Sequence, residues 1–368
     1  MSKFDKWLKN NGTEILKKLY KANSKKDIKF KINDSSLIEL DVSDWDVSKF
    51  KSLQKCFYGY DGLEMLNVKN WNVENVFDLS SCFLDCQMLK ELDLSNWHTD
   101  SLQDLYRTFN NCYSLKKITF GKDFSTKYAQ NLMCTFSACS SLKTLDIKDW
   151  NVENIVNMGG CFSMCEKLTD IDISSWKFKK LQYLTLCFYD CESLQNLDIS
   201  KWNVSKVVDL GSCFRGCKSL RSLDLKSWNT SNVRELGSCF YSCTLLEDID
   251  LSKWNTSNVD NMDYCFSECY MIKKLDLSSW TVSKVKDMSY CFSFCASLEE
   301  LNIKNWCIND KAKTEGIFGL CGSLSKIYCN KETFDRFMKT NSLPNLITDK
   351  GEQKSKWSWS NGLAKRDD

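Results

Sequence analysis

Residues 220–243 read LRSLDLKSWNTSNVRELGSCFYSC, and this pattern recurs with small changes along most of the 368-residue chain. Its phenylalanine belongs to a file of eleven with a period of 26 residues, broken by one interval of 27, and its tryptophan belongs to a file of ten. A fixed period of roughly 20–50 residues is typical of a solenoid, in which each coil packs on its neighbours. The sequence therefore predicts eleven stacked coils. The two files are Phe57, Phe83, Phe109, Phe136, Phe162, Phe188, Phe214, Phe240, Phe266, Phe292, Phe318 and Trp45, Trp71, Trp97, Trp150, Trp176, Trp202, Trp228, Trp254, Trp280, Trp306.

Each coil carries the signals of a strand followed by turns. Leu223 and Leu225 flank one outward residue, and this alternation is the period-two signal of a strand. Stacked coils would place such strands side by side, about 4.8 Å apart, as one long parallel sheet. The polar run 229–232 predicts a corner, because Asn and Ser side chains bond to nearby backbone. We expect a short second strand at 233–236 and one helical turn at 239–243. The predicted fold class is a mainly β repeat solenoid with short helical turns.

The unit has a known counterpart, most clearly at residues 275–292, LDLSSWTVSKVKDMSYCF. It resembles the repeat of the BspA-like leucine-rich-repeat family, in its 26-residue subclass, and the likeness covers about residues 37–330. The resemblance implies a right-handed leucine-rich-repeat solenoid of bacterial surface-protein type, with roles in adhesion and protein–protein contact and no enzymatic activity. The chain departs from that family at the position before the phenylalanine, which is mostly Cys here and usually Met there.

The ends of the chain differ from the repeat. Residues 1–36 are predicted to form an N-terminal helical cap, with an amphipathic helix over 3–22 that Gly12 interrupts. The eleven coils occupy 37–330, and residues 331–350 are predicted to form a C-terminal cap helix, because a solenoid exposes apolar surface at each end. Residues 351–368 are polar, carry Trp357 and Trp359, and predict a flexible tail.

Two columns of cysteine run through the repeat and admit three interpretations. The cysteines form four-thiolate metal sites, or they form disulfides between coils, or they are buried free thiols that act as small hydrophobes. The first column also accepts Thr108, Thr135 and Ile317, which indicates a slot of fixed volume. The second column is Cys in every coil except at Tyr60, as expected of a thiol that donates to a backbone carbonyl. The pattern favours buried thiols. The complete pairs are 82/86, 161/165, 187/191, 213/217, 239/243, 265/269 and 291/295.

One outward position of the strand is aspartate in most coils. Such a file of carboxylates either bonds to backbone and Ser at the sheet edge or forms an acidic stripe that receives a basic partner surface or divalent cations. We take these residues as the candidate binding site. They are Asp93, Asp146, Asp172, Asp198, Asp224, Asp250 and Asp276.

Composition excludes several classes of function. The net charge of +2 gives no field to attract nucleic acid, and no apolar stretch is long enough to span a membrane. His98 is the only histidine and no glycine-rich phosphate loop occurs, so we expect no catalytic residues, no metal and no cofactor. The N-terminus resembles neither a signal peptide nor a lipobox, which favours the cytoplasm over the cell surface.

The sequence thus predicts a non-catalytic scaffold that binds a protein partner along its exposed strand face. We expect the strongest contacts at the irregular coil around Lys122–Gln130 and in the tail. A surface adhesin and a thiol-rich metal or redox protein are the alternatives.

Overall fold

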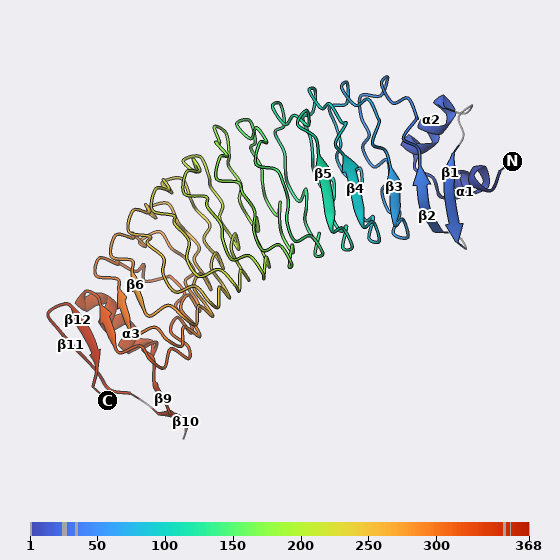
Figure 1. Cartoon of the computed structure of the whole chain (residues 1–368). Coiled ribbons are helices and arrows are strands. Elements are labelled where there is room, and N and C mark those ends of the chain that lie inside the picture. Colours follow the sequence, from blue (N-terminus) through green and yellow to red (C-terminus); the bar gives the residue numbers. More distant parts are fainter. Residues whose placement is uncertain (1, 24–27, 34–35, 349–350, 354, 368) are drawn as a thin grey trace. The chain divides into compact units, whose positions relative to one another are not determined.

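The structure is a computed structural model that describes residues 2–23, 28–33, 36–348, 351–353 and 355–367. The chain divides into two compact units, Met1–Leu181 and Gln182–Asp368, which we describe separately. Each unit is a stack of coils in which one sequence repeat makes one turn of a β-solenoid (Figure 1). The predicted repeat solenoid is confirmed.

The first unit carries its sheet on one side of the stack, in the order β1-β2-β3-β4-β5. Strand β1 is antiparallel to β2, and the following strands are parallel, with Leu40 paired to Leu66 and Leu92 to Ile118. The paired leucines point inward and form the core. The elements are α1 (Lys3–Asn11), α2 (Glu14–Ala22), β1 (Lys29–Asn33), β2 (Ser36–Asp41), β3 (Met65–Asn67), β4 (Glu91–Leu94) and β5 (Lys117–Phe120).

The second unit ends in a sheet with the order β11-β12-β8-β7-β6. Strands β6, β7 and β8 are parallel neighbours, and β12 adds to β8 in the antiparallel sense. Strands β9 and β10 form a separate antiparallel pair. The elements are β6 (Lys274–Asp276), β7 (Glu300–Asn302), β8 (Lys326–Tyr328), α3 (Lys331–Lys339), β9 (Leu346–Thr348), β10 (Gly351–Gln353), β11 (Trp357–Ser360) and β12 (Leu363–Arg366).

The tail that the sequence predicts to be flexible is instead a β-hairpin over residues 357–366. Strand β12 pairs with the open edge of β8, which supplies backbone partners that a free tail would lack. Both indoles are anchored, since Trp357 Nε1 donates to the Pro344 carbonyl at 3.0 Å and Trp359 Nε1 donates to the Cys329 carbonyl at 3.1 Å. Polar composition alone therefore misjudged this segment.

The one long parallel sheet that the sequence predicts is also shorter than expected. In the described coils between β5 and β6, single bridges such as Thr144–Asp170 and Ser222–Asp248 replace strands on this side. The predicted second strand reduces to one bridging residue per coil, as at Asp209–Glu235.

The predicted helical turn at the Cys-Phe-x-x-Cys step is a pair of consecutive tight turns. Ser238 and Ser242 have φ of 56° and 57°, and the amides of Cys239 and Cys243 each bond back three residues at 3.1 Å. A positive φ at the third residue of a turn is the geometry of type II. The Phe240 amide between them bonds instead to the Cys265 carbonyl of the next coil at 2.9 Å. Because alternate amides bond between coils, no helical ladder forms.

The predicted files fill the core. The indoles of Trp254 and Trp280 stack with ring centroids 6.0 Å apart, and Phe240 and Phe266 stack at 5.4 Å. The expected thiol bond of the second cysteine column is present, for example from Cys243 Sγ to the Phe214 carbonyl at 3.1 Å. Core side chains thus carry hydrogen bonds from one coil to the preceding one, in addition to apolar contact.

The irregular coil around Lys122–Gln130 lacks the tryptophan, but the stack of aromatic rings in the core continues through it. Phe124 is buried and stacks on Trp150 at 5.6 Å, and Phe120 meets the same indole edge-on at 5.1 Å. Gly121 is required here, because an added Cβ would come within 1.9 Å of the Ser95 carbonyl oxygen. Two phenylalanines therefore occupy the space of one tryptophan.

The predicted N-terminal helix over 3–22 is two helices. Gly12 ends α1, and Thr13 caps α2 by accepting the Leu16 amide at 3.2 Å. The rings of Trp7 and Tyr60 lie 5.3 Å apart, so α1 contacts the first coil. At the other end of the chain, Phe337 of α3 meets Phe318 at 5.2 Å.

Candidate functional site

The aspartate file lies on the strand face, and its carboxylates are occupied by their own coils. In six of the seven candidate residues, Oδ1 accepts the amide two residues further on, at distances of 2.9–3.3 Å. Asp146 is exposed. This Asx-turn contact ends the short strand and starts the corner. The six are Asp93, Asp172, Asp198, Asp224, Asp250 and Asp276.

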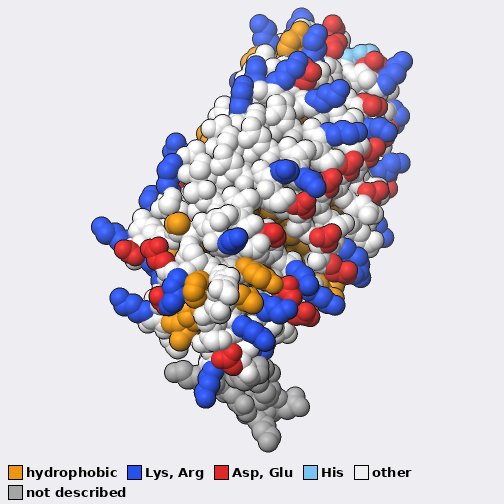
Figure 2. Space-filling view, turned by 90° about the vertical axis from the view of Figure 1, so that its left-hand side faces the viewer, with side chains coloured by type: hydrophobic (Ala, Val, Ile, Leu, Met, Phe, Trp, Pro, Cys, Tyr) orange, Lys and Arg blue, Asp and Glu red, His pale blue; other side chains and the backbone are white. Residues whose placement is uncertain are grey.

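Lysines from the preceding coil pair with part of this file. Lys69 lies 2.9 Å from Asp93, and Lys226 lies 3.1 Å from Asp250. Burial acts to raise the pKa of Asp93, but hydrogen bonds from Lys69 and Ser95 outweigh it and bring the pKa to about 2. Hydrogen bonds from Ser252 and then Lys226 lower the pKa of Asp250 to about 2. Asp93 and Asp250 are therefore charged at neutral pH, and each faces a lysine of the preceding coil. Figure 2 shows the same interleaving of acidic and basic side chains on its right-hand side.

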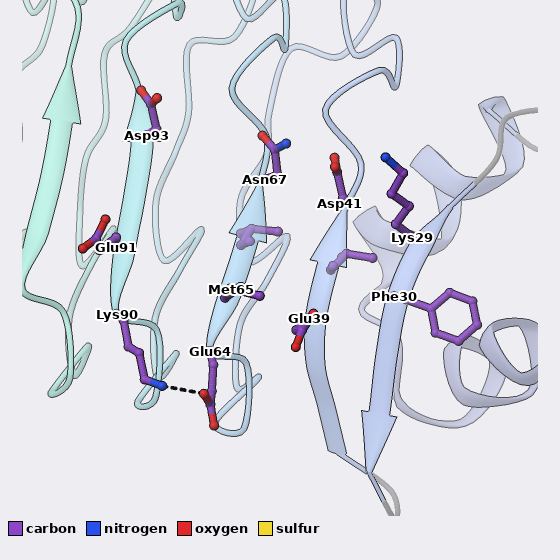
Figure 3. A pocket seen from close by; sticks show the side chains of 12 residues that line it. Lys29, Phe30, Glu39, Asp41, Glu64, Met65, Asn67, Lys90, Glu91 and Asp93 are labelled. Carbon is purple, nitrogen blue, oxygen red and sulfur yellow. Dashed lines mark hydrogen bonds and ion pairs between the residues drawn. The ribbon is translucent and has the colours of Figure 1, made fainter.

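A hollow of about 730 Å³ lies on the strand face over β1–β4, and we call it the β1–β4 hollow. Met65 lies at its centre with 54% of its surface exposed, paired with Glu39 of β2 on one side and with Glu91 of β4 on the other. Figure 3 shows these three side chains across the neighbouring strands. The remaining lining residues are Lys29, Phe30, Leu40, Asp41, Glu64, Leu66, Asn67, Lys90 and Asp93.

The rim of the β1–β4 hollow is held by ion pairs between neighbouring strands. Lys90 lies 2.6 Å from Glu64, and Lys31 of β1 lies 3.2 Å from Glu39 of β2 (Figure 3 shows the former). Phe30 turns away from the hollow toward α1, where its ring lies 5.1 Å from Phe4. Met65 is therefore the exposed apolar group within a charged frame. Sequence reasoning missed it, although a Met at an outward strand position is a readable signal.

A second hollow, of about 380 Å³, lies on the strand face of the second unit. The position equivalent to Met65 is taken there by charged residues, and Glu300 receives both Lys274 at 3.3 Å and Lys326 at 2.7 Å. The charged side chains at this position therefore pair with one another. Compared with this hollow, the β1–β4 hollow offers an apolar centre.

The cysteines are not arranged for chemistry. All but Cys134 and Cys307 are buried, and burial raises the pKa of Cys165 and Cys243 to about 12. A protonated, shielded thiol is a poor nucleophile and a poor metal ligand. Among the described residues, no group of three or more His, Cys, Asp or Glu side chains could hold a metal ion.

Comparison with known proteins identifies a family. The sequence matches the model described as "Mycoplasma protein of unknown function, DUF285" over residues 26–133, 114–223 and 208–330. The chain belongs to this family. Comparison with curated proteins gives no match. The 26-residue BspA-like subclass remains a prediction.

Three solved structures are similar to the chain. A leucine-rich cell-surface protein of Faecalibacterium prausnitzii is 12% identical, with 83% of this chain and 88% of that one covered and a TM-score of 0.36. A leucine-rich-repeat protein of Leptospira interrogans is 14% identical, with 86% of both chains covered and a TM-score of 0.29. The functional domain of InlJ from Listeria monocytogenes, described as including a cysteine ladder, is 13% identical, with 63% and 54% covered and a TM-score of 0.20.

The predicted cytoplasmic location finds no support in these comparisons. Within the described parts of the chain, no helix has the length and apolar character needed to cross a bilayer.

Proposed function

We propose that this protein is a non-catalytic scaffold that binds a protein partner on the strand face of its first unit, over the β1–β4 hollow. The observation that carries the proposal is Met65, an exposed apolar side chain at the centre of a charged frame. An apolar centre with a polar rim is the usual anatomy of a protein–protein interface. Met also adapts its shape to a partner, because its side chain is flexible and polarizable.

The rim supports a partner with charges of both signs. Lys29 and Lys90 lie on the same rim as Glu91 and Asp93, so a partner needs matching charges to dock without leaving one unpaired. We propose that the aspartate file contributes weak contacts along the strands and does not form a stripe for a purely basic partner. Its carboxylates already hold the turns and meet lysines of the preceding coil.

The thiol-rich metal or redox alternative is disfavoured by the cysteine geometry. The second-column thiols donate to carbonyls inside the stack, as Cys112 Sγ does to the Phe83 carbonyl at 3.2 Å. A thiol used in this way supports the fold. A surface adhesin is the same scaffold displayed outside a cell, and the experiment below would identify its partner as well.

The test is a quantitative affinity capture with three versions of the full chain. Wild type, Met65→Lys and the control Met88→Lys are immobilised, exposed to an extract of the source organism and compared by mass spectrometry. Met88 is also exposed, at 44%, but lies outside the β1–β4 hollow. We expect one or more proteins to be retained by wild type and Met88→Lys and lost from Met65→Lys.

The captured partner is then purified and its affinity measured directly. Loss of one buried Met contact together with an unpaired lysine should weaken binding at least about tenfold. Equal retention by all three versions would contradict a binding site at the β1–β4 hollow.

A further inference from the structure

A second surface in the Gln182–Asp368 unit gathers aromatic side chains on the side of the coils where the tight turns lie. We call Tyr189, Arg215, Tyr241, Tyr264 and Tyr290 the aromatic cluster. Tyr264 and Tyr290 stack with centroids 4.9 Å apart, and Tyr241 meets Tyr264 edge-on at 6.0 Å. None of these rings belongs to the core files, so packing of the coils does not account for them.

The exposed surface continues beyond the cluster on neighbouring coils. Tyr264 is 37% exposed, and Phe294 and Leu320 are 44% and 47% exposed. Phe294 and Leu320 each lie two residues after a core phenylalanine, so they hold equivalent positions in successive coils. Exposed apolar groups that adjoin one another in this way mark interaction surfaces more often than isolated ones do.

Arg215 is an example of a guanidinium held by tyrosine rings on this side of the coils. Its guanidinium lies over the ring of Tyr189 at 5.4 Å and over the ring of Tyr241 at 4.6 Å. Each of these residues directly follows a core phenylalanine, one coil apart, so the spacing of the stack fits a guanidinium between two tyrosines. In the part of the chain that the structure describes, no Lys or Arg lies over Tyr264 or Tyr290. Tyr264 and Tyr290 belong to another column, two residues before the core phenylalanines, and they stack on each other.

Carboxylates hold the rings and set the charge of the surface. The Tyr241 hydroxyl donates to Glu268 at 3.0 Å, and the Tyr290 hydroxyl donates to Glu315 at 3.1 Å. These bonds fix the rings before a ligand arrives, which lowers the entropic cost of binding. The two acids also favour a cationic ligand over an anionic one.

A cavity of about 510 Å³ continues this surface. Glu315, which accepts the bond from Tyr290, is the one ionisable side chain among its lining residues, which otherwise come from residues 314–320 and 340–345. The ring of Tyr290 lies against Gly316 at the cavity wall, where an added Cβ would come within 2.4 Å of Cε1. The cluster and the cavity therefore share Glu315 and Gly316.

We propose that the aromatic cluster and its cavity bind a segment of another protein that carries arginine side chains. The guanidinium groups would lie beside the Tyr264–Tyr290 pair, with Glu268 and Glu315 as counter-charges. The surface belongs to the second unit and is independent of the β1–β4 hollow. The net charge of +2 means that a basic segment must be attracted locally.

The test uses the full chain and short labelled peptides in a fluorescence-anisotropy titration. The probe peptide alternates Ser and Arg, and two matched peptides carry citrulline or Glu in place of Arg. Citrulline keeps the shape of arginine without its charge. We expect the arginine peptide to bind, the citrulline peptide to bind at least about tenfold more weakly, and the Glu peptide not to bind.

Matched variants locate the site. Tyr264→Ser with Tyr290→Ser should weaken binding of the arginine peptide about tenfold, whereas Tyr113→Ser with Tyr128→Ser, exposed tyrosines of the first unit, should leave it unchanged. Glu268→Gln with Glu315→Gln keeps the ring acceptors but should weaken binding and reduce its salt dependence. Thermal unfolding verifies that each variant is folded. Absence of binding, equal binding of the citrulline peptide, or an unaffected Tyr264/Tyr290 variant would overturn the proposal.

Discussion

The interior and the strand face of a single coil are built by different kinds of bond. In the coil that begins at Leu246, Trp254 donates to the Leu225 carbonyl at 3.2 Å and Cys269 donates to the Phe240 carbonyl at 3.2 Å, both in the preceding coil. On the strand face, Asp250 accepts the Ser252 amide of its own coil at 3.0 Å. Interior side chains bond one coil to the next, so a substitution at one of them also affects the neighbouring coil. Face residues mainly serve their own turn, so they can vary from coil to coil and carry the differences that function needs.

High pH should have the largest effect, because it acts on the whole interior at once. Burial raises the pKa of thiols such as Cys165 and Cys243 from 9.0 to about 12. A raised pKa gives stability that is complete below pH 9 and is lost as the pH rises toward 12. In this range, each such thiol would lower the free energy of unfolding of the protein by about 1.4 kcal/mol per pH unit.

Melting curves followed by circular dichroism, from about pH 8 to 11, test this dependence. The melting temperature should fall steeply above pH 9, and thiolate absorbance should appear only as the chain unfolds. Thiolate absorbance from a chain that is still folded would show that the interior is open to solvent, and the contrast with the strand face would fail.

Removal of one tryptophan should have the next largest effect. Trp228 is buried, stacks on Trp254 at 6.2 Å and donates to the Ile199 carbonyl at 3.1 Å. Trp228→Ala should cost about 3–5 kcal/mol through the cavity it leaves. Trp228→Phe keeps a ring but removes the indole donor. The Ile199 carbonyl still accepts the Trp202 amide at 3.1 Å, so the lost hydrogen bond should cost about 0.5–1.5 kcal/mol. Urea denaturation measures both, with exposed Phe294→Ala as the control, expected within about 0.5 kcal/mol of wild type.

The two cysteine columns should respond differently to the same substitution. Cys243→Val removes the thiol bond to the Phe214 carbonyl, which still accepts the Cys217 amide at 3.1 Å, and should cost about 0.5–1.5 kcal/mol beyond any change in packing. Cys239→Val should cost less than about 1.5 kcal/mol, because that column elsewhere accepts Thr or Ile. Urea denaturation of the pair is the measurement. Equal costs would mean that the second column, too, is only a slot of fixed volume.

A strand-face substitution should have the smallest effect. Asp93→Asn removes the charge that faces Lys69 but keeps an acceptor for the Ser95 amide, so we expect a loss below about 1 kcal/mol at neutral pH. The lowered pKa of Asp93, about 2 against 3.8, gives stability that is present above pH 3.8 and is lost as the pH falls toward 2. The variant should therefore show a shallower acid limb in a pH series of melting temperatures. A loss as large as that of Trp228→Ala would place this residue with the interior.

The sequence predicts the interior well because the interior repeats. The period of the aromatic files, and the strictness of the second cysteine column, are properties of one coil that can be read directly. The β1–β4 hollow was missed, since it depends on which residues of three neighbouring strands stand beside Met65. The hairpin of residues 357–366 was missed because its partner is the open edge of β8, a feature of the folded stack. The helical turn was wrong because Cys-x-x-x-Cys spacing also suits two tight turns, which need the positive φ seen at Ser238 and Ser242.

The indole bonds give the stack a direction. In both units a tryptophan donates to the coil before it, as Trp97 does to the Val68 carbonyl and Trp306 to the Leu277 carbonyl. Trp45, in the first coil, has no coil before it, and its buried Nε1 meets no acceptor among the residues that the structure describes. When coils are added from the N-terminus, each new indole meets a carbonyl acceptor in the coil that is already folded. If coils were added from the C-terminus, each new indole would be buried before its acceptor was in place. For the indole bonds, the order of synthesis therefore supplies the acceptor before the donor.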